Sequence, residues 1–302
     1  MNLAILIAAA VLVAVLVRAL LLGLADLRSI GLRSAYRTEV RRQHDLLEAT
    51  CMQPAPVVTV GDLARLPPAV ATYLKRAGVL GKPRPRSVHV VFRARMRNRP
   101  QDRWMQATAE QHNFYGPTGP ARLFFMTASQ LGLPFVAFHR YVGDAATFQV
   151  RVAGLVPIID ARGPQMNQSE TVTMLNDMFV LAPGALVDAN IRWETQPDGR
   201  VKATFTNAGQ TVSALVRFDA AGDLVDFVSR DRYQSNGKVY NLLPWSTPVR
   251  DFRDFDGIRL PSRGDARWQE SGGEWTYGEF TIERLTYDQP QDGARVAQRR
   301  LG

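Results

Sequence analysis

Residues 87–97, which read Ser-Val-His-Val-Val-Phe-Arg-Ala-Arg-Met-Arg, decide the fold class. One set of alternate positions holds Val88, Val90, Phe92, Ala94 and Met96, and the other holds His89, Val91, Arg93, Arg95 and Arg97. Successive side chains of a β-strand point to opposite faces, so this period of two predicts a strand with one buried face. The other face carries a row of arginines.

Further stretches with the same period predict that this strand belongs to an antiparallel sheet. Met105, Ala107 and Ala109 follow a short turn and predict a hairpin partner. Later alternating runs lie at residues 148–152, 201–205, 212–218 and 277–287, the last with a change of phase typical of a bulge. Turn sequences separate them: Asp198-Gly199, Ala221-Gly222-Asp223, Asp256-Gly257 and Gly272-Gly273. We expect a mainly β (α+β) fold, an antiparallel curved sheet or half-barrel with a few covering helices.

Three segments favour helices. Residues 34–50 are charged and free of Gly and Pro. A second helix begins at Pro68 and stops at Gly78. A third has Ser169 as its expected N-cap and Pro183 as its terminator, and we expect it to cover an open face of the sheet.

The N-terminus predicts a membrane anchor, because residues 3–25 are apolar apart from Arg18 and Gly23. Twenty-three helical residues extend about 34 Å, enough to cross a hydrocarbon core of about 30 Å. Arg18 lies toward the C-terminal end, where its side chain can reach the head groups. A cleaved signal peptide is the competing interpretation, since Gly23-Leu24-Ala25 offers small residues at a cleavage position.

The charges that flank this segment predict its orientation. Five arginines follow it (Arg28, Arg33, Arg37, Arg41 and Arg42), and only the α-amino group precedes it. The positive-inside rule then places the main domain on the cytoplasmic side of a bacterial inner membrane, with a periplasmic or extracytoplasmic domain as the alternative after cleavage. The expected domains are an anchor (1–27), a juxtamembrane helix and linker (28–59), a β-rich globular domain (60–290) and a basic tail (291–302).

The composition, and the lack of several known motifs, argue against disulfides, common catalytic sites and metal sites. The 302 residues include one cysteine, Cys51, so no internal disulfide is expected. Phosphate-binding loops, dinucleotide fingerprints, nucleophile elbows and Cys-x-x-Cys pairs are missing from the sequence. The four histidines, His44, His89, His112 and His139, have no metal-ligand spacing. We therefore expect neither a cofactor nor a metal site.

A polar and aromatic group of residues is the first candidate binding site. It comprises Asn176, Asp177, Trp193, Glu194, Arg230, Asp231, Arg232, Tyr233 and Trp245, with Tyr240 beside them. Such residues can line a ligand pocket, and a carboxylate among Asp177, Glu194 and Asp231 would allow an unrecognised hydrolase. They are equally typical of salt-bridged strand ends with aromatic residues over a core.

The arginine row is the second candidate. The net charge of +9 is concentrated, since residues 75–103 hold ten basic side chains against Asp102. Arg93, Arg95 and Arg97 could contact anionic lipid beside the anchor. In this alternative the protein is an anchored scaffold that uses the arginine row to bind the membrane surface. The alternative without function is a solvated face balanced by Glu110 and neighbouring polar residues. Few aromatic residues lie between the basic ones, so nucleic-acid binding is not favoured.

Several short motifs carry a resemblance to a known family. They are Leu66-Pro67-Pro68 with Tyr73-Leu74, Asn176-Asp177-Met178 with Pro183, Ile191-Arg192-Trp193-Glu194, Arg230-Asp231-Arg232-Tyr233 and Pro244-Trp245. Together, over roughly residues 60–288, the chain resembles a bacterial domain-of-unknown-function family whose members carry N-terminal hydrophobic segments. The resemblance implies no particular activity.

A second likeness concerns residues 252–261, where a strand, the Asp256-Gly257 turn and a strand ending at Pro261 are expected. This run is similar to the half-barrels of lipoprotein carriers and lipid-binding envelope proteins. The likeness implies an apolar ligand in the concave face, with the helix near Ser169 as its cover. Our leading hypothesis is therefore a membrane-anchored, non-catalytic domain that binds a lipid or other apolar ligand. The sequence does not identify a protein partner.

Overall fold

The computed structural model describes residues 31–130, 132–153, 156–235 and 238–288. The predicted anchor at residues 3–25 and the basic tail at 291–302 lie outside these ranges. Among the residues that are described, no helix is both long enough and apolar enough to cross a membrane.

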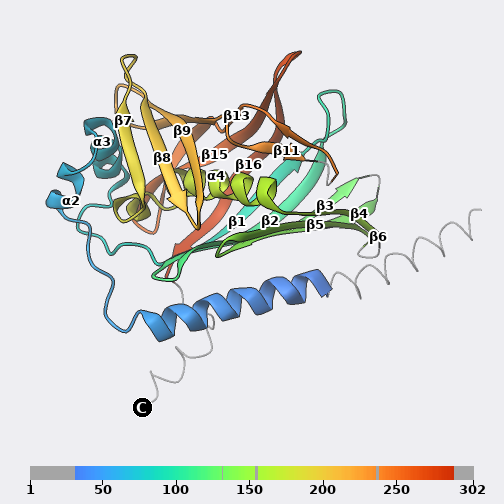
Figure 1. The fold of residues 1–302 in the computed structure, drawn as a ribbon, viewed down its shortest axis with the longest axis horizontal. Coiled ribbons are helices and arrows are strands. Elements are labelled where there is room, and N and C mark those ends of the chain that lie inside the picture. Colours follow the sequence, from blue (N-terminus) through green and yellow to red (C-terminus); the bar gives the residue numbers. More distant parts are fainter. Residues whose placement is uncertain (1–30, 131, 154–155, 236–237, 289–302) are drawn as a thin grey trace, which may run out of the picture.

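One large antiparallel sheet dominates the described part of the chain, and it curls into a half-barrel (Figure 1). Its strands run in the order β6-β5-β4-β3-β2-β1-β16-β15-β13-β10-β9-β8-β7, with β14 paired to β15. The first half contains β1 (Ser87–Met96), β2 (Met105–Gly116), β3 (Gly119–Gln130), β4 (Leu133–Val142), β5 (Ala145–Val152) and β6 (Val156–Arg162). The second half contains β7 (Ile191–Thr195), β8 (Val201–Asn207), β9 (Gln210–Phe218), β10 (Leu224–Ser229), β13 (Trp245–Ser246), β14 (Val249–Phe255), β15 (Ile258–Glu270) and β16 (Gly273–Tyr287). The mainly β, curved antiparallel sheet expected from the sequence is confirmed.

Strand β1, which contains the alternating residues described first, pairs as predicted. β1 forms a hairpin with β2, in which Phe92 faces Ala109 across the strands. On its other side β1 pairs with β16, where Val91 lies opposite Arg284 and Phe92 opposite Ile282. Glu283 is therefore the extra residue of a bulge, at the change of phase that the sequence indicates.

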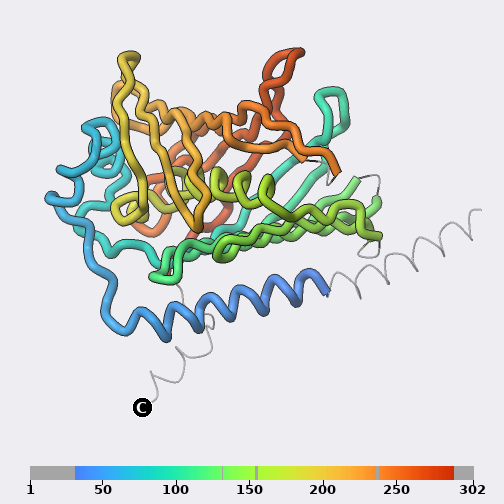
Figure 2. The backbone as a smooth tube through the Cα atoms, in the orientation of Figure 1, coloured from blue at the N-terminus to red at the C-terminus, as the bar shows by residue number. Residues whose placement is uncertain are grey.

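Helix α4 (Pro164–Val180) lies within the curl of the sheet, and Figure 2 shows the strands bending around it. The helix begins five residues before the predicted N-cap Ser169, which was therefore wrong as a boundary. Pro164 suits the first turn, and Gly163 precedes it at φ 100° and ψ −174°, a conformation that essentially only glycine adopts. Ser169 instead donates to the carbonyl of Gln165 and accepts the amide N–H of Tyr233. The expected covering role of the helix is confirmed.

A second helix, residues 31–50, packs on the opposite, convex face of the sheet (Figure 1). Its Leu32, Tyr36 and Val40 follow a spacing of four and are buried against apolar side chains of β2, β3 and β4. Three of those side chains are Phe114, Phe125 and Phe138. The sheet therefore buries both of its faces here, and the alternation of β2 to β4 separates two apolar layers rather than a core from solvent.

The remaining elements are short helices and one two-stranded ribbon. α2 (Val60–Ala64) and α3 (Pro68–Ala77) lead into the sheet, and α3 stops at Gly78 as predicted. The short helix η1 (Pro183–Val187) follows α4, and β11 (Tyr233–Ser235) pairs with β12 (Tyr240–Leu242) as a separate ribbon. The expected end of a strand at Pro261 was wrong, because β15 continues to Glu270. Pro261 lies in the part of β15 that pairs with β14.

Candidate functional site

A cavity of about 870 Å³ lies between α4 and the inner, concave face of the sheet. Strands β1 to β6 provide one wall, and β13, β15, β16 and the ribbon β11–β12 provide another. Protein interiors contain few voids larger than a water molecule. A space of this size is therefore much larger than an ordinary packing void. Its volume falls within the roughly 300–1,000 Å³ typical of small-molecule sites.

The wall of the cavity is mainly apolar and aromatic. Alternation along the strands brings every second residue inward. The apolar lining residues on the first wall include Phe124, Met126, Phe135, Ala137, Phe148, Val150 and Ile159. Those on the second wall include Trp245, Trp268, Trp275, Tyr277, Phe280 and Ile282. Such a wall favours a ligand with a substantial hydrocarbon surface.

A buried ionic network lies between α4 and strands β2 and β3. Arg122 of β3 donates from Nη1 to Glu170 at 2.9 Å and from Nε to Asp177 at 2.8 Å, and its side chain is 9% exposed. Glu170 and Asp177 are seven residues apart on α4, which places them on the same face of the helix. Gln111 and Asn113 of β2 also donate to Asp177, at 2.8 and 3.0 Å. The network fixes α4 against the inner face of the sheet.

The pKa values of the two carboxylates in this network, Glu170 and Asp177, shift in opposite directions. Burial alone would raise the pKa of Glu170, but Arg122 and His139 hold that pKa well below its usual range. Burial raises the pKa of Asp177 despite the attraction of Arg122. The single guanidinium therefore compensates Glu170 first, and Asp177 accepts hydrogen bonds from neutral amides as well.

Some polar atoms of the cavity wall have no hydrogen-bond partner. Nδ1 of His139 and Oε1 of Glu170 are 3.2 Å apart, yet neither makes a hydrogen bond of acceptable geometry. Nε1 of Trp275 is also buried and without a partner. An unsatisfied buried polar group costs free energy, on the order of 1–3 kcal/mol. These atoms belong to residues that line the cavity, although the atoms themselves are buried.

Arg232 places a cation in the cavity wall. Its guanidinium carbon lies 4.5 Å from the ring centroid of Trp245 and 5.3 Å from that of Trp268, and its Nε donates to Thr173 of α4 at 3.2 Å. No carboxylate of the described residues lies within 4.0 Å of it. The two indole rings stabilise the positive charge by cation–π contact, but they leave it free to attract an anion.

Five of the nine residues of the predicted polar and aromatic group line this cavity. They are Asn176, Asp177, Arg232, Tyr233 and Trp245. They come from α4, the start of β11 with the residue before it, and β13, so the fold unites residues that are up to 69 positions apart in the sequence. Asn176 accepts a hydrogen bond from Thr247 at 2.5 Å, which holds the residue after β13 to α4.

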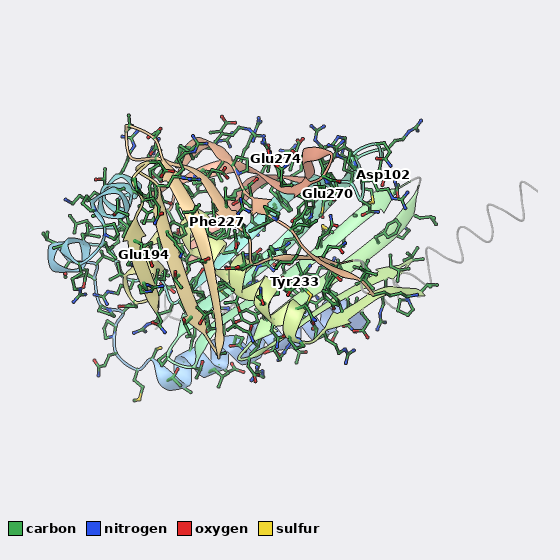
Figure 3. All side chains as sticks on the ribbon, turned by 45° about the horizontal axis from the view of Figure 1, so that its top comes forward. Asp102, Glu194, Phe227, Tyr233, Glu270 and Glu274 are labelled. Carbon is green, nitrogen blue, oxygen red and sulfur yellow. The ribbon has the colours of Figure 1, made fainter. Side chains whose placement is uncertain are left out.

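The other four predicted residues lie elsewhere. Trp193 packs on Phe179 from β7, and Arg230 is exposed. Glu194 pairs with Arg192 at 2.8 Å, and Figure 3 shows it toward the left edge of the molecule, whereas Tyr233 lies near the centre. Asp231 accepts from the amide and the hydroxyl of Ser213, at 2.6 and 3.0 Å. The carboxylates of Asp177, Glu194 and Asp231 thus do not share a site.

Arg93 and Arg95 of the arginine row lie on the convex side of the sheet, whereas Arg97, just beyond the end of β1, is among the residues that line the cavity. All three have partners. Arg93 pairs with Glu283 at 3.1 Å and Arg95 with Glu279 at 2.6 Å, both on β16. Arg97 donates to the carbonyl of Thr276 at 2.8 Å and lies over the ring of Trp104. Glu110, the balancing residue expected from the sequence, instead contacts His89.

Sequence reasoning missed the ionic network, although a signal for it was present. Arg122 is the one charge within the run Ala121-Arg122-Leu123-Phe124-Phe125, and Gln111 continues the buried phase of Ala107 and Ala109. A polar side chain at a core position requires a buried partner. His139 and Glu170 carried no comparable signal, because their partners are set by tertiary packing.

The sheet and its cavity define this chain as a half-barrel protein with an internal, mainly apolar pocket. The model of the Family of unknown function (DUF6544) matches residues 56–280, and the chain belongs to that family. This confirms the resemblance drawn from its short motifs. No curated protein matches the chain.

Three solved structures show a weak likeness to the chain. A LolA superfamily protein from Nitrosomonas europaea is 13% identical, with 73% of this chain and 94% of that chain covered and a TM-score of 0.38. A DUF1329 family protein from Desulfovibrio piger is 12% identical, with 78% and 100% covered and a TM-score of 0.38. A domain from Vibrio parahaemolyticus, provisionally described as an outer membrane lipoprotein-sorting protein, is 12% identical, with 71% and 91% covered and a TM-score of 0.37. At TM-scores this low, nothing about the ligand or function of those proteins transfers to this chain.

Proposed function

We propose that this protein binds an apolar or amphipathic small molecule, such as a lipid, in the cavity between α4 and the concave face of the sheet. The observation that carries the proposal is the cavity itself, about 870 Å³ in volume and walled by aromatic and aliphatic side chains. Removing a hydrocarbon ligand from water into such a space is worth about 0.8 kcal/mol for each buried methylene group. This gain supplies the affinity.

The polar groups in the wall support an amphipathic ligand with an anionic head. The guanidinium of Arg232 has two indole neighbours and no carboxylate within 4.0 Å among the described residues. His139 and Trp275 add buried nitrogen atoms without hydrogen-bond partners. A carboxylate or phosphate group would compensate the charge of Arg232 through charge-assisted hydrogen bonds, which are stronger than neutral ones. The head group would then be held near α4 and the tail along β3 to β5.

Extraction followed by a matched pair of variants tests the proposal. The purified protein is extracted with organic solvent, and native mass spectrometry of the intact chain measures any bound mass. Met126→Trp enlarges a side chain that lines the cavity, whereas Thr127→Trp enlarges its neighbour on the other face of β3. We expect Met126→Trp to abolish binding of a fluorescent fatty acid and Thr127→Trp to keep it. Equal binding by both variants would place the ligand outside the cavity.

We also propose that the cavity works beside a membrane. The apolar residues 3–25 and the arginines that follow them support an anchor with the cavity domain on the cytoplasmic side. A lipid ligand would then be exchanged with the adjacent leaflet. Protease treatment of intact cells tests the orientation: the domain is expected to resist digestion until the inner membrane is permeabilised, and digestion in spheroplasts would reverse the assignment.

A further inference from the structure

We propose that His89, Glu110 and His112 form a binding site for a divalent transition metal such as Zn²⁺ on the convex face of the sheet. One ligand atom from each of the three side chains lies within 4.8 Å of the other two. Nε2 of His89 is 3.0 Å from Oε1 of Glu110. Two imidazoles and one carboxylate are a donor set that zinc uses where three protein ligands leave a further position open.

The strand register explains how these residues meet. His89 of β1 and His112 of β2 are directly opposite each other in the hairpin. Glu110 precedes His112 by two residues, so its side chain is on the same face of β2. The spacing of the histidines along the chain predicts no metal site. Spacing along the chain does not detect a site of this kind, because pairing across a hairpin brings distant positions together.

Helix 31–50 covers the cluster and supplies its second layer of contacts. The hydroxyl of Tyr36 is 2.7 Å from Nδ1 of His112, and Tyr36 is itself buried. A metal-bound histidine usually engages its other ring nitrogen in a hydrogen bond of this kind, which leaves Nε2 for the metal. The ring of His44 lies 6.0 Å from that of His112. Three of the four histidines of the chain are therefore gathered between this helix and the sheet.

Metal binding requires a modest rearrangement. The rings of His89 and His112 are stacked, with centroids 4.2 Å apart and an interplanar angle of 10°, so their in-plane lone pairs do not yet converge. A turn of one ring about its Cβ–Cγ bond aims both nitrogens at one point. Neighbouring ligands of a tetrahedral zinc ion are about 3.3 Å apart, so the cluster also contracts.

Calorimetric titration of the full chain with ZnCl₂, in a mild detergent and a buffer without chelators, tests the site. We expect one equivalent to bind with a Kd at or below roughly 1 µM. The double substitution His89→Gln and His112→Gln is expected to weaken binding by at least about 100-fold. Cys51→Ser is the matched control, because Cys51 is the one thiol in the sequence, and its titration should equal that of the unmodified chain.

Glu110→Gln provides a second test of the metal site in case the double variant does not fold. Its side chain is 39% exposed, so the substitution is expected to leave the near-ultraviolet circular dichroism spectrum unchanged while weakening Zn²⁺ binding about tenfold or more. Titration with Co²⁺ provides a spectroscopic reading, since ligation by imidazole produces visible absorption bands. A Kd above about 100 µM for the unmodified chain, or equal binding by the unmodified chain and Glu110→Gln, overturns the proposal.

Discussion

Nη1 of Arg122 lies 2.9 Å from Oε2 of Glu170, and the two side chains are only 9% and 0% exposed. This ion pair joins β3 to α4, the helix that lies within the curl of the sheet. Both charged groups are removed from water, so each depends on the other to offset the free-energy cost of burying its charge. The same guanidinium also contacts Asp177, which makes Arg122 the one cation shared by two buried carboxylates.

The substitution Arg122→Met therefore has a large expected cost. It leaves Glu170 and Asp177 buried without their counter-charge, and breaking a buried pair typically costs about 3–5 kcal/mol. Both carboxylates would then be easier to protonate in the folded than in the unfolded chain. The loss of stability should consequently grow as the pH rises from 4 to 8, which urea unfolding at several pH values measures.

Arg95→Met is the matched control for this measurement. Arg95 also pairs with a glutamate, Glu279, but its side chain is 47% exposed. Exposed pairs contribute on the order of 0–1 kcal/mol, so this variant should unfold almost as the unmodified chain does. Comparable losses in the two variants would mean that Arg122 does not carry the proposed structural role.

The length of the ligand's hydrocarbon tail should control its affinity. Each buried methylene group contributes about 0.8 kcal/mol, which corresponds to a roughly fourfold lower Kd. We expect this factor for successive saturated fatty acids until the 870 Å³ cavity is filled, beyond which the affinity levels off. Competition against a fluorescent fatty acid measures the series. A Kd that is independent of tail length would contradict burial of the tail.

Arg232 should distinguish ligands by their head groups. Arg232→Gln removes the charge near Trp245 and Trp268 but keeps a polar side chain beside Thr173. Hydrogen bonds to charged groups contribute about 1.5–3 kcal/mol, so a fatty acid should bind roughly 10- to 100-fold more weakly. The fatty alcohol of the same length should bind with nearly unchanged affinity. Calorimetry with both ligands separates the head-group effect from any loss of packing.

Arg263→Gln serves as the control for that substitution. Arg263 also lines the cavity, but its Nε lies 3.4 Å from the carboxylate of Asp251, so its charge already has a partner. We expect little change for either ligand. An equal loss of fatty-acid affinity in both variants would show a general effect of cavity charge and not a contact at Arg232.

The strands could be predicted from the sequence because their signal is local. The alternation in residues 87–97 and the turns at Asp198-Gly199 and Asp256-Gly257 each depend on neighbouring residues, and the structure places strands and turns there. The extra length of α4 was not predictable in this way. Its polar residues before Ser169 carry no helical apolar spacing, and Glu170 is tolerated inside only because Arg122 meets it from another element.

The candidate site could be predicted only in part, for the same reason. Asn176, Asp177, Arg232, Tyr233 and Trp245 share aromatic and polar character with Trp193 and Glu194, yet only the first five line the cavity. Residue type alone cannot distinguish the lining residues from the other two, because the curvature of the whole sheet determines which residues face the cavity. The histidine cluster follows from the β1–β2 register, and the helix that covers it ends at residue 50, 39 residues before His89.

Asp226 on β10 gives a prediction of the pH dependence of stability. Burial raises its pKa from 3.8 to about 6. A carboxyl group whose pKa is higher in the folded chain stabilises the fold below its unfolded pKa, and this contribution is lost as the pH rises through 6. Asp226→Asn cannot ionise and retains an oxygen to accept the amide N–H of Phe227. Its free energy of unfolding should exceed that of the unmodified chain at pH 7.5 by about 1–2 kcal/mol, with allowance for partial solvent screening, and match it near pH 4.

Asp198→Asn tests the sign of this argument. A side-chain hydrogen bond from Arg200 holds the pKa of Asp198 below its usual value, so its ionised form favours the folded chain. Removing that carboxylate should lower the midpoint of thermal unfolding at pH 7.5 and have progressively less effect as the pH falls below 4. The two aspartate variants are therefore expected to shift the midpoint in opposite directions at pH 7.5. A shift in the same direction would mean that the environment of Asp226 does not favour its protonated form.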